Sequence, residues 1–247
     1  MMDSIFMRGV MVTAQKNVRI YYTKAPVLIF GLLFPIFMFF AFYMGRSIEI
    51  SVFFPGFCAM ALFFASSSVG PLITPWEKQA GTYERLLSFP VSINVIVLGD
   101  MLSGAIYGVL ISMAVLAVSL IALGLSFNPL ILMISVVLGS LCFASLGVLL
   151  SSPSVRSPAN IMMFSSMIRF PLIFISGIFI PLAEMDGIGR AFSYLSPLSY
   201  LVDLFNAGLS RGTEFPLLLD IIVLAGFTSA FLLIASRFHR RNLMKGL

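Results

Sequence analysis

Residues 76–92, WEKQAGTYERLLSFPVS, form the longest polar interruption between two long apolar blocks of the chain. The stretch carries two acids and two bases, Glu77, Lys78, Glu84 and Arg85, whereas the flanking blocks carry almost no charge. A membrane protein that keeps such a stretch usually exposes it to water. The stretch therefore separates two groups of candidate membrane-spanning segments.

The composition is that of an integral membrane protein. Of the 247 residues, 60% are hydrophobic and 10% are charged, whereas soluble domains are about 25% charged. Residues 1–24 lack the apolar core of a signal peptide, so we expect no cleaved leader. Cys58 and Cys142 both lie in apolar runs and are expected to be small core residues rather than a disulfide. The net charge of +5 reflects topology and does not indicate a nucleic-acid partner.

Six apolar segments are long enough to cross a bilayer, which takes about 20 residues. They cover 25–45, 52–73, 93–125, 130–150, 159–180 and 217–236, with a short polar turn at 46–49. Pro35 is expected to kink the first segment and to leave a carbonyl for a neighbouring helix to satisfy. The sequence therefore predicts an all-α polytopic membrane protein with six transmembrane helices.

The remaining segments are polar or amphipathic. Residues 1–24 favour an amphipathic helix on an anionic membrane surface, with a short solvated arm as the alternative. Its apolar residues recur at helical spacing: Met7, Met11, Ala14, Val18 and Tyr21. We expect one transmembrane domain over 1–247, divided into the interfacial helix 1–24, spans 25–73, the polar stretch 76–92, spans 93–180, an external segment 181–216, span 217–236 and a basic tail 237–247.

The distribution of Lys and Arg orients the chain. Six crossings place both termini, the 76–92 stretch and the Arg156 loop on one side, which then carries eleven of the fifteen basic residues. The eleven are Arg8, Lys16, Arg19, Lys24, Lys78, Arg85, Arg156, Arg237, Arg240, Arg241 and Lys245. An excess of Lys and Arg marks the cytoplasmic face. We therefore expect cytoplasmic termini, and residues 181–216 outside.

The spacing within 76–92 predicts a short amphipathic helix. Tyr83, Leu86 and Leu87 lie at positions i, i+3 and i+4 and form an apolar stripe. Glu77 and Glu84 are seven residues apart and would share a face of the same helix.

The same stretch contains signals for the two ends of that helix. Thr82, which follows Gly81, is in position to cap its start, and Pro90 ends it. A helix this short is not stable alone in water. It therefore needs a partner surface, either its own bundle or another protein.

Three motifs follow one another along the chain. The first is Glu77-x-x-x-Gly81-Thr82-x-Glu84-Arg85-Leu86-Leu87, closed by Pro90-Val91-Ser92; the others are SGIFIPL at 176–182 and LSPLSYLVD at 195–203. Their order and spacing resemble the ABC type-2 permease family, the membrane subunits of ATP-driven exporters of drugs, lipids and polysaccharides. Family members often carry a base soon after Pro-Val-Ser, where this chain has Ile93 and Asn94.

The resemblance implies a cytoplasmic coupling helix between spans two and three, an N-terminal interfacial helix, and short external re-entrant helices before span six. It also implies a dimer with a second copy or a paralogue in the cell membrane, each permease bound to one ABC ATPase subunit that carries the ATP and Mg. The residues that would couple to the ATPase are Glu77, Gly81, Thr82, Tyr83, Glu84, Arg85, Leu86 and Leu87. Three of them would be apolar anchors in a groove of the ATPase: Tyr83, Leu86 and Leu87. Glu84 and Arg85 would contact the rim of that groove.

Two further residues are candidates for a pathway or an interface. Arg169 lies within the fifth span, where a charge is costly and must face the bundle interior, a dimer interface or water; a structural ion pair is the alternative. Asp203 lies in the external segment with Glu184, Asp186 and Arg190. These side chains could pair among themselves or line an exit, or the segment could be a structural cap.

The sequence lacks a G-x-x-x-x-G-K-[ST] phosphate loop, so hydrolysis of ATP is expected on a partner chain. The single histidine, His239, argues against a multi-His metal site and a Ser–His dyad. We therefore expect no catalytic residue, metal or cofactor in this chain, and a permease subunit of an ABC exporter. An ion-coupled secondary transporter or channel is the alternative, with a non-transporting membrane scaffold as a third possibility.

Overall fold

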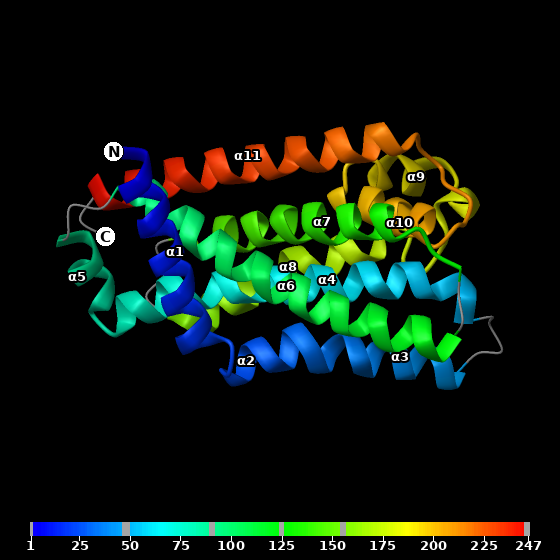
Figure 1. Cartoon of the computed structure of the whole chain (residues 1–247), viewed down its shortest axis with the longest axis horizontal. Helices are drawn as coiled ribbons and strands as arrows, with labels where there is room; N and C mark the ends of the chain where they lie inside the picture. Colours follow the sequence, from blue (N-terminus) through cyan, green and yellow to red (C-terminus); the bar gives the residue numbers. More distant parts are fainter. Residues whose placement is uncertain (1, 46–49, 89–91, 124–125, 154–156, 245–247) are drawn as a thin grey trace.

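The computed structural model describes residues 2–45, 50–88, 92–123, 126–153 and 157–244. Within these ranges the chain is helical and contains no β-strand. Most of its helices run side by side in one elongated bundle (Figure 1). The predicted turn at 46–49, the helix end at Pro90 and the loop at Arg156 lie outside the described residues.

The central helix of the bundle is α4 (Ile50–Gln79), whose side chains are almost all buried. It packs against α6 (Ile93–Leu123) and α7 (Pro129–Leu150). A Cβ added to Gly70 of α4 would lie 2.5 Å from the carbonyl carbon of Gly147 in α7. A Cβ added to Gly108 of α6 would lie 1.9 Å from Ser66 Oγ. Small residues of this kind let helices approach closely in a bilayer.

A π-helical turn divides the first apolar segment. α2 (Ala25–Leu28) leads into the turn η1 (Ile29–Leu33), which continues as α3 (Phe34–Gly45). Pro35 has no N–H to donate to the carbonyl of Gly31 four residues earlier, and π turns accommodate such breaks. The disturbance predicted at Pro35 therefore takes the form of the turn η1.

The first helix, α1 (Met2–Tyr21), lies across the bundle rather than along it (Figure 1). The segments Ile5–Tyr21 and Ala25–Ala41 meet at an angle of 90°. α1 buries Val10, Ala14 and Tyr21 against the bundle, whereas Met7 and Met11 of the predicted apolar stripe are exposed. The bundle thus covers only part of the apolar surface of the helix, and the predicted contact of the exposed part with a membrane surface stays a prediction.

The structure is that of a multi-pass membrane protein, and the count of six spans stays a prediction. Among the described residues, four helices are long and apolar enough to cross a bilayer: α4, α6, α7 and α11 (Leu217–Met244). The α2–α3 rod and the shorter helix α8 (Pro158–Phe174) correspond to the other two predicted spans.

Two predicted span ends differ from the helix ends of the structure. The fifth segment was expected to run to Ile180, but α8 ends at Phe174, and Gly177 soon afterwards has a φ of +83° that a helix cannot contain. The sixth segment was expected to end at 236, but α11 continues to Met244. Arg237, Arg240 and Arg241 of the predicted tail are good helix formers, so the helix extends through them.

The two ends of the bundle differ. The α1–α5 end holds α1, the short helix α5 (Thr82–Ser88) and the last turns of α11; the opposite, α9–α10 end holds α9 (Gly187–Ser193), α10 (Pro197–Gly208) and the 3₁₀ turn η2 (Leu182–Glu184) (Figure 1). α10 is almost wholly buried, against α4, α7 and α11. The start of α1 and the end of α11 lie at the same end, as an even number of crossings requires.

Replacing Gly70 by alanine should destabilise the bundle, because its Cβ would collide with the backbone of α7 and overpacking costs about 1–3 kcal/mol. The measurement is the thermal unfolding temperature of the purified protein in detergent. Gly226→Ala in α11 is the matched control, since nothing lies within 4 Å of its added Cβ. Equal unfolding temperatures for the two variants would contradict the close α4–α7 contact.

Candidate functional site

The polar stretch 76–92 folds as the end of one helix and a second, short helix. α4 continues to Gln79, and α5 begins after Gly81. Gly81 has a φ of +66°, a conformation that glycine adopts without steric cost. The prediction that Glu77 and Glu84 share a face of one helix is therefore wrong, because the break at Gly81 puts them on different helices.

Gly81 and Thr82 end α4. The Gly81 N–H donates to the Lys78 carbonyl at 3.2 Å, and the Thr82 hydroxyl donates to the Glu77 carbonyl at 3.2 Å. These bonds satisfy carbonyls that a helix end leaves free. Thr82 thus closes the preceding helix, and as the first residue of α5 it does not occupy the predicted cap position. Gly81 is exposed with open space around it, so its close approach to a partner stays a prediction.

The helix α5 has an attached side and an exposed side. Tyr83 is 4% exposed, and Lys78 Nζ lies 5.5 Å from its ring centroid. Arg85 and Ser88 are exposed, and Leu86 is partly exposed. Tyr83 therefore anchors α5 to its own chain, while Leu86 and Arg85 remain accessible. Two of the predicted coupling residues have side chains outside the described part of the structure: Glu84 and Leu87.

Polar contacts tie α1 to two of the long helices. The Lys16 ammonium pairs with the Glu77 carboxylate of α4, and Asn17 Nδ2 donates to Asp100 Oδ1 of α6 at 2.7 Å. Glu77, Asn17 and Asp100 are all buried. The carboxylate of Glu77 is thus held inside its own chain, at the end of the helix that leads into α5.

Arg169 lies in α8 and is 1% exposed, which makes it the largest fully buried side chain described. Its Nε and Nη2 atoms lie 3.0 and 2.5 Å from Ser165 Oγ, one helical turn earlier. No carboxylate pairs with it, and its Nη1 has no hydrogen-bond partner, among the residues that the structure describes. The ion pair that was the alternative explanation of this residue is therefore not found within the described part of the chain.

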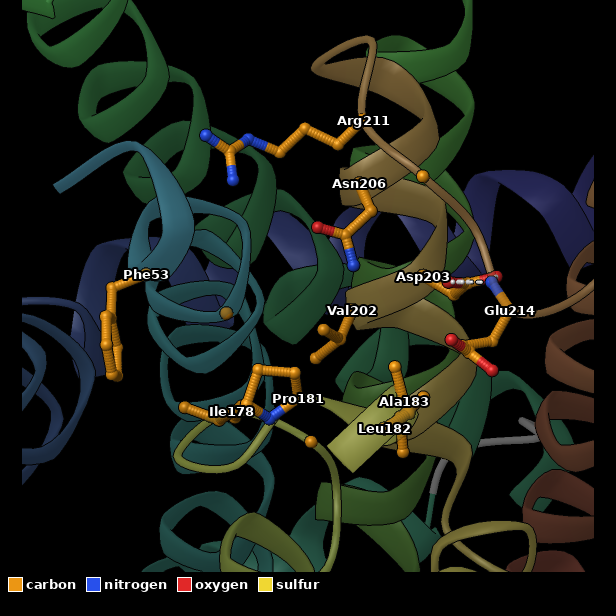
Figure 2. A pocket seen from close by; sticks show the side chains of 13 residues that line it. Phe53, Ile178, Pro181, Leu182, Ala183, Val202, Asp203, Asn206, Arg211 and Glu214 are labelled. Carbon is orange, nitrogen blue, oxygen red and sulfur yellow. Dashed lines mark hydrogen bonds between the residues drawn. The ribbon is translucent and has the colours of Figure 1, made fainter. Parts of the chain in front are cut away.

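Asp203 lies in α10 and holds the linker to α11. Its Oδ1 accepts the Glu214 N–H and its Oδ2 accepts the Phe215 N–H, each at 2.9 Å. Burial raises the pKa of Asp203, and these N–H groups act in the opposite direction. Asp203 also lines a cavity of about 220 Å³ at the α9–α10 end (Figure 2). Its role in a pathway or an interface stays a prediction.

The other charges predicted to cluster with Asp203 are arranged differently. Arg190 Nη2 lies 3.2 Å from Glu214 Oε2, and its Nε donates to the Tyr194 hydroxyl at 2.8 Å. The partner of Arg190 is therefore Glu214 and not one of the predicted acids. Across the described ranges, no group of three or more His, Cys, Asp or Glu side chains could hold a metal ion.

Comparison with known proteins identifies the family. The profile described as ABC-2 type transporter matches residues 8–210, which is most of the chain. The chain belongs to this family. It is also similar to proteins named "Inner membrane transport permease YadH" from Escherichia coli strain K12, Escherichia coli O157:H7 and Shigella flexneri. Each is 28% identical over 160 residues, which cover 64% of this chain and 62% of the relative.

Membership of the ABC-2 family confirms the resemblance drawn from the three motifs, but the motifs did not point to the contacts of α1. Lys16, Asn17 and Asp100 were not among the predicted site residues. One signal could have indicated them: a lone acid in an apolar helix, such as Asp100, requires a polar partner. The identity of that partner depends on the crossing of α1, which the sequence does not specify.

Replacing Lys16 by methionine should destabilise the protein more than the double variant Lys16→Met/Glu77→Gln. The single variant leaves a buried carboxylate without its cation, and removing one partner of a buried pair costs about 3–5 kcal/mol. The double variant leaves two neutral side chains. Thermal unfolding in detergent measures the difference, and a double variant no more stable than the single one would contradict the pairing.

Proposed function

We propose that this chain is the permease subunit of an ABC exporter, which moves a substrate outward with energy from a separate ATPase subunit. Membership of the ABC-2 type transporter family supports a transport role. The observation that carries the proposal is α5, a short helix with an exposed side at one end of a membrane bundle. A water-soluble ATPase can reach such a helix without entering the bilayer.

The geometry of α5 suits it to transmit a displacement from the ATPase to the bundle. Seven residues are too few for an independent helix, and Tyr83 fixes α5 to the bundle. Leu86 and Arg85 then offer one apolar and one charged contact to a groove, a common mode of helix recognition. Movement of α5 would reach α4 through Gly81 and α1 through the Lys16–Glu77 ion pair.

The charge distribution supports a cytoplasmic α1–α5 end. α1, α5 and the last turns of α11 lie together there (Figure 1), and with Lys24 and Lys78 they carry nine of the fifteen Lys and Arg residues of the chain. Such an excess marks the cytoplasmic side of a membrane protein. Both termini would then be cytoplasmic, the α9–α10 end would face outward, and the protein would reside in the cell membrane.

ATP hydrolysis would take place on a partner chain. The ATPase subunit would bind ATP and Mg, while this chain would bind neither and would not be an enzyme itself. A second copy or a paralogue would complete a dimer within membrane lipid. Arg169 would line the pathway or the dimer interface, where an acid of the second subunit or a substrate could approach its buried Nη1.

One observation favours the alternative of an ion-coupled transporter. Asp220 in α11 is fully buried, and neither of its carboxylate oxygens has a hydrogen-bond partner among the described residues. Buried acids within membrane helices carry protons in pumps and transporters. Transport that follows a proton gradient, with no ATPase bound, would favour this alternative over the exporter.

Leu86→Asp should release the ATPase, because it places a charge on the apolar contact of α5. The tagged permease is purified from its own membranes in mild detergent, and the stoichiometry of a co-purifying ATPase chain is measured. Ser88→Asp adds the same charge to the exposed end of the same helix and should retain the ATPase. Full retention of the ATPase by Leu86→Asp would contradict the proposed contact.

Arg169→Ala should lower substrate-stimulated ATP hydrolysis by the reconstituted complex several-fold while leaving assembly intact. Ser165→Ala is the control, since it removes the hydrogen bonds described for Arg169 but keeps its charge. If the charge acts on a substrate or interface, Ser165→Ala retains most of the activity. Equal activity of Arg169→Ala and wild type, at equal expression, would refute the role.

A further inference from the structure

The cavity at the α9–α10 end has a mainly apolar wall. Phe53 from the start of α4, Ile178 and Pro181 from the linker after α8, and Val202 from α10 contribute to it (Figure 2). Gly56 of α4 packs directly on this linker, because a Cβ added there would lie 3.2 Å from Ile178 Cα. Helix and linker therefore form one continuous surface along this side of the cavity.

Of the charged side chains that line the cavity, the two acids have bonding partners and the arginine does not, within the described ranges. The Asp203 carboxylate accepts the N–H groups of Glu214 and Phe215, and the Glu214 carboxylate pairs with Arg190. Arg211 also lines the cavity, and no residue in the described ranges forms an ion pair or a side-chain hydrogen bond with its guanidinium. Arg211 is therefore the charged side chain of the cavity wall that has no bonding partner in the described ranges.

A helix-ending motif fixes the position of Arg211. After α10 ends at Gly208, the Ser210 N–H donates to the Ala207 carbonyl at 3.2 Å and the Arg211 N–H donates to the Asn206 carbonyl at 2.9 Å. This pair of bonds is a Schellman motif, whose left-handed position is usually a glycine. Here it is Ser210, with a φ of +56°. The turn directs the Arg211 side chain over the cavity, above the Asn206 amide (Figure 2).

We propose that this cavity binds the anionic group of an amphiphile, a phosphate or a carboxylate, with Arg211 and Asn206 as its ligands. The planar guanidinium donates two parallel hydrogen bonds to anionic oxygens. The Asn206 amide supplies a further N–H donor from the last turn of α10. A bound anion would pair with the Arg211 guanidinium, to which neither acid of the cavity wall is bonded.

The size and the lining of the cavity indicate what carries the anion. Its volume of about 220 Å³ is below the roughly 300–1,000 Å³ of pockets that enclose a whole drug-sized ligand. The cavity therefore accommodates a head group, while Phe53, Ile178 and Val202 meet the apolar part of the same molecule. A membrane phospholipid and an exported anionic amphiphile share this chemistry. The site depends neither on the ATPase nor on the direction of transport proposed above.

Native mass spectrometry of the full-length protein released from detergent micelles tests the site. The probes are phosphatidylglycerol, zwitterionic phosphatidylcholine and inorganic phosphate, each added alone. We expect wild-type protein to retain phosphatidylglycerol in preference to phosphatidylcholine. Arg211→Gln should bind it about tenfold more weakly, the effect of one lost charge-assisted contact. Arg211→Lys, which keeps the charge without the planar fork, should bind with intermediate affinity.

Matched variants separate this site from general charge effects. Arg240→Gln removes the same charge from an exposed position at the opposite end and should bind like wild type. Asn206→Leu provides a second test at the cavity and should also weaken binding. Inorganic phosphate that binds alone and is lost in Arg211→Gln would assign the site to a free anion. Equal retention of phosphatidylglycerol by wild type and Arg211→Gln, or an equal loss in Arg240→Gln, would overturn the proposal.

Discussion

The close contact of α4 with α6 and α7 is the constraint on which the rest of the structure depends. In lipid, apolar side chains gain little by leaving the surrounding hydrocarbon, so helices associate through direct packing. The glycines and serines along these helices permit that packing, as at Gly70 against Gly147 and Gly108 against Ser66. Larger residues there would separate the helices and remove the contacts that make α4 the centre of the bundle.

The central helix α4 also connects the region of α5 with the cavity at the opposite end of the bundle. Its last turn ends at Gln79, next to α5, and its first turns carry Phe53 and Gly56 on the wall of the cavity. If α5 receives a displacement from an ATPase, as proposed above, this single buried helix would pass it toward the other end. Pro55, Pro71 and Pro75 lie inside this helix, and each interrupts the hydrogen-bond ladder at a point where a helix bends most easily.

The sequence predicts the class of this structure because composition and periodicity are local properties. The apolar segments gave the helical bundle, and the spacing of Tyr83 and Leu86 predicted a short helix where α5 is found. The motifs led to the correct family. The polar contacts could not be predicted in the same way. Lys16 and Glu77 are 61 positions apart, and only the crossing of α1 over the end of α4 brings them together.

The same limit applies to α1. Its apolar stripe was predicted to lie on a membrane surface, but the sequence did not show that the bundle covers Val10 and Ala14 and leaves Met7 and Met11 exposed. Which part of an amphipathic surface meets protein depends on the neighbouring helices. A helix start next to Gly81 was predicted, but Glu77 was placed on the same face as Glu84. Glu77 belongs to the end of α4, because the left-handed turn at Gly81 separates the two helices.

The connection of α1 to the bundle has an energetic consequence for the membrane around it. A helix that lies at right angles to the first span and is bound to α4 by an ion pair must follow the end of α4 when that end moves. Its exposed residues include Met7 and Met11 together with Arg8 and Arg19, which suit acyl chains and anionic head groups respectively. Each movement of α4 would then displace these exposed side chains of α1 within the head-group layer. The lipid composition of that leaflet would therefore contribute to the free-energy barrier of each conformational change.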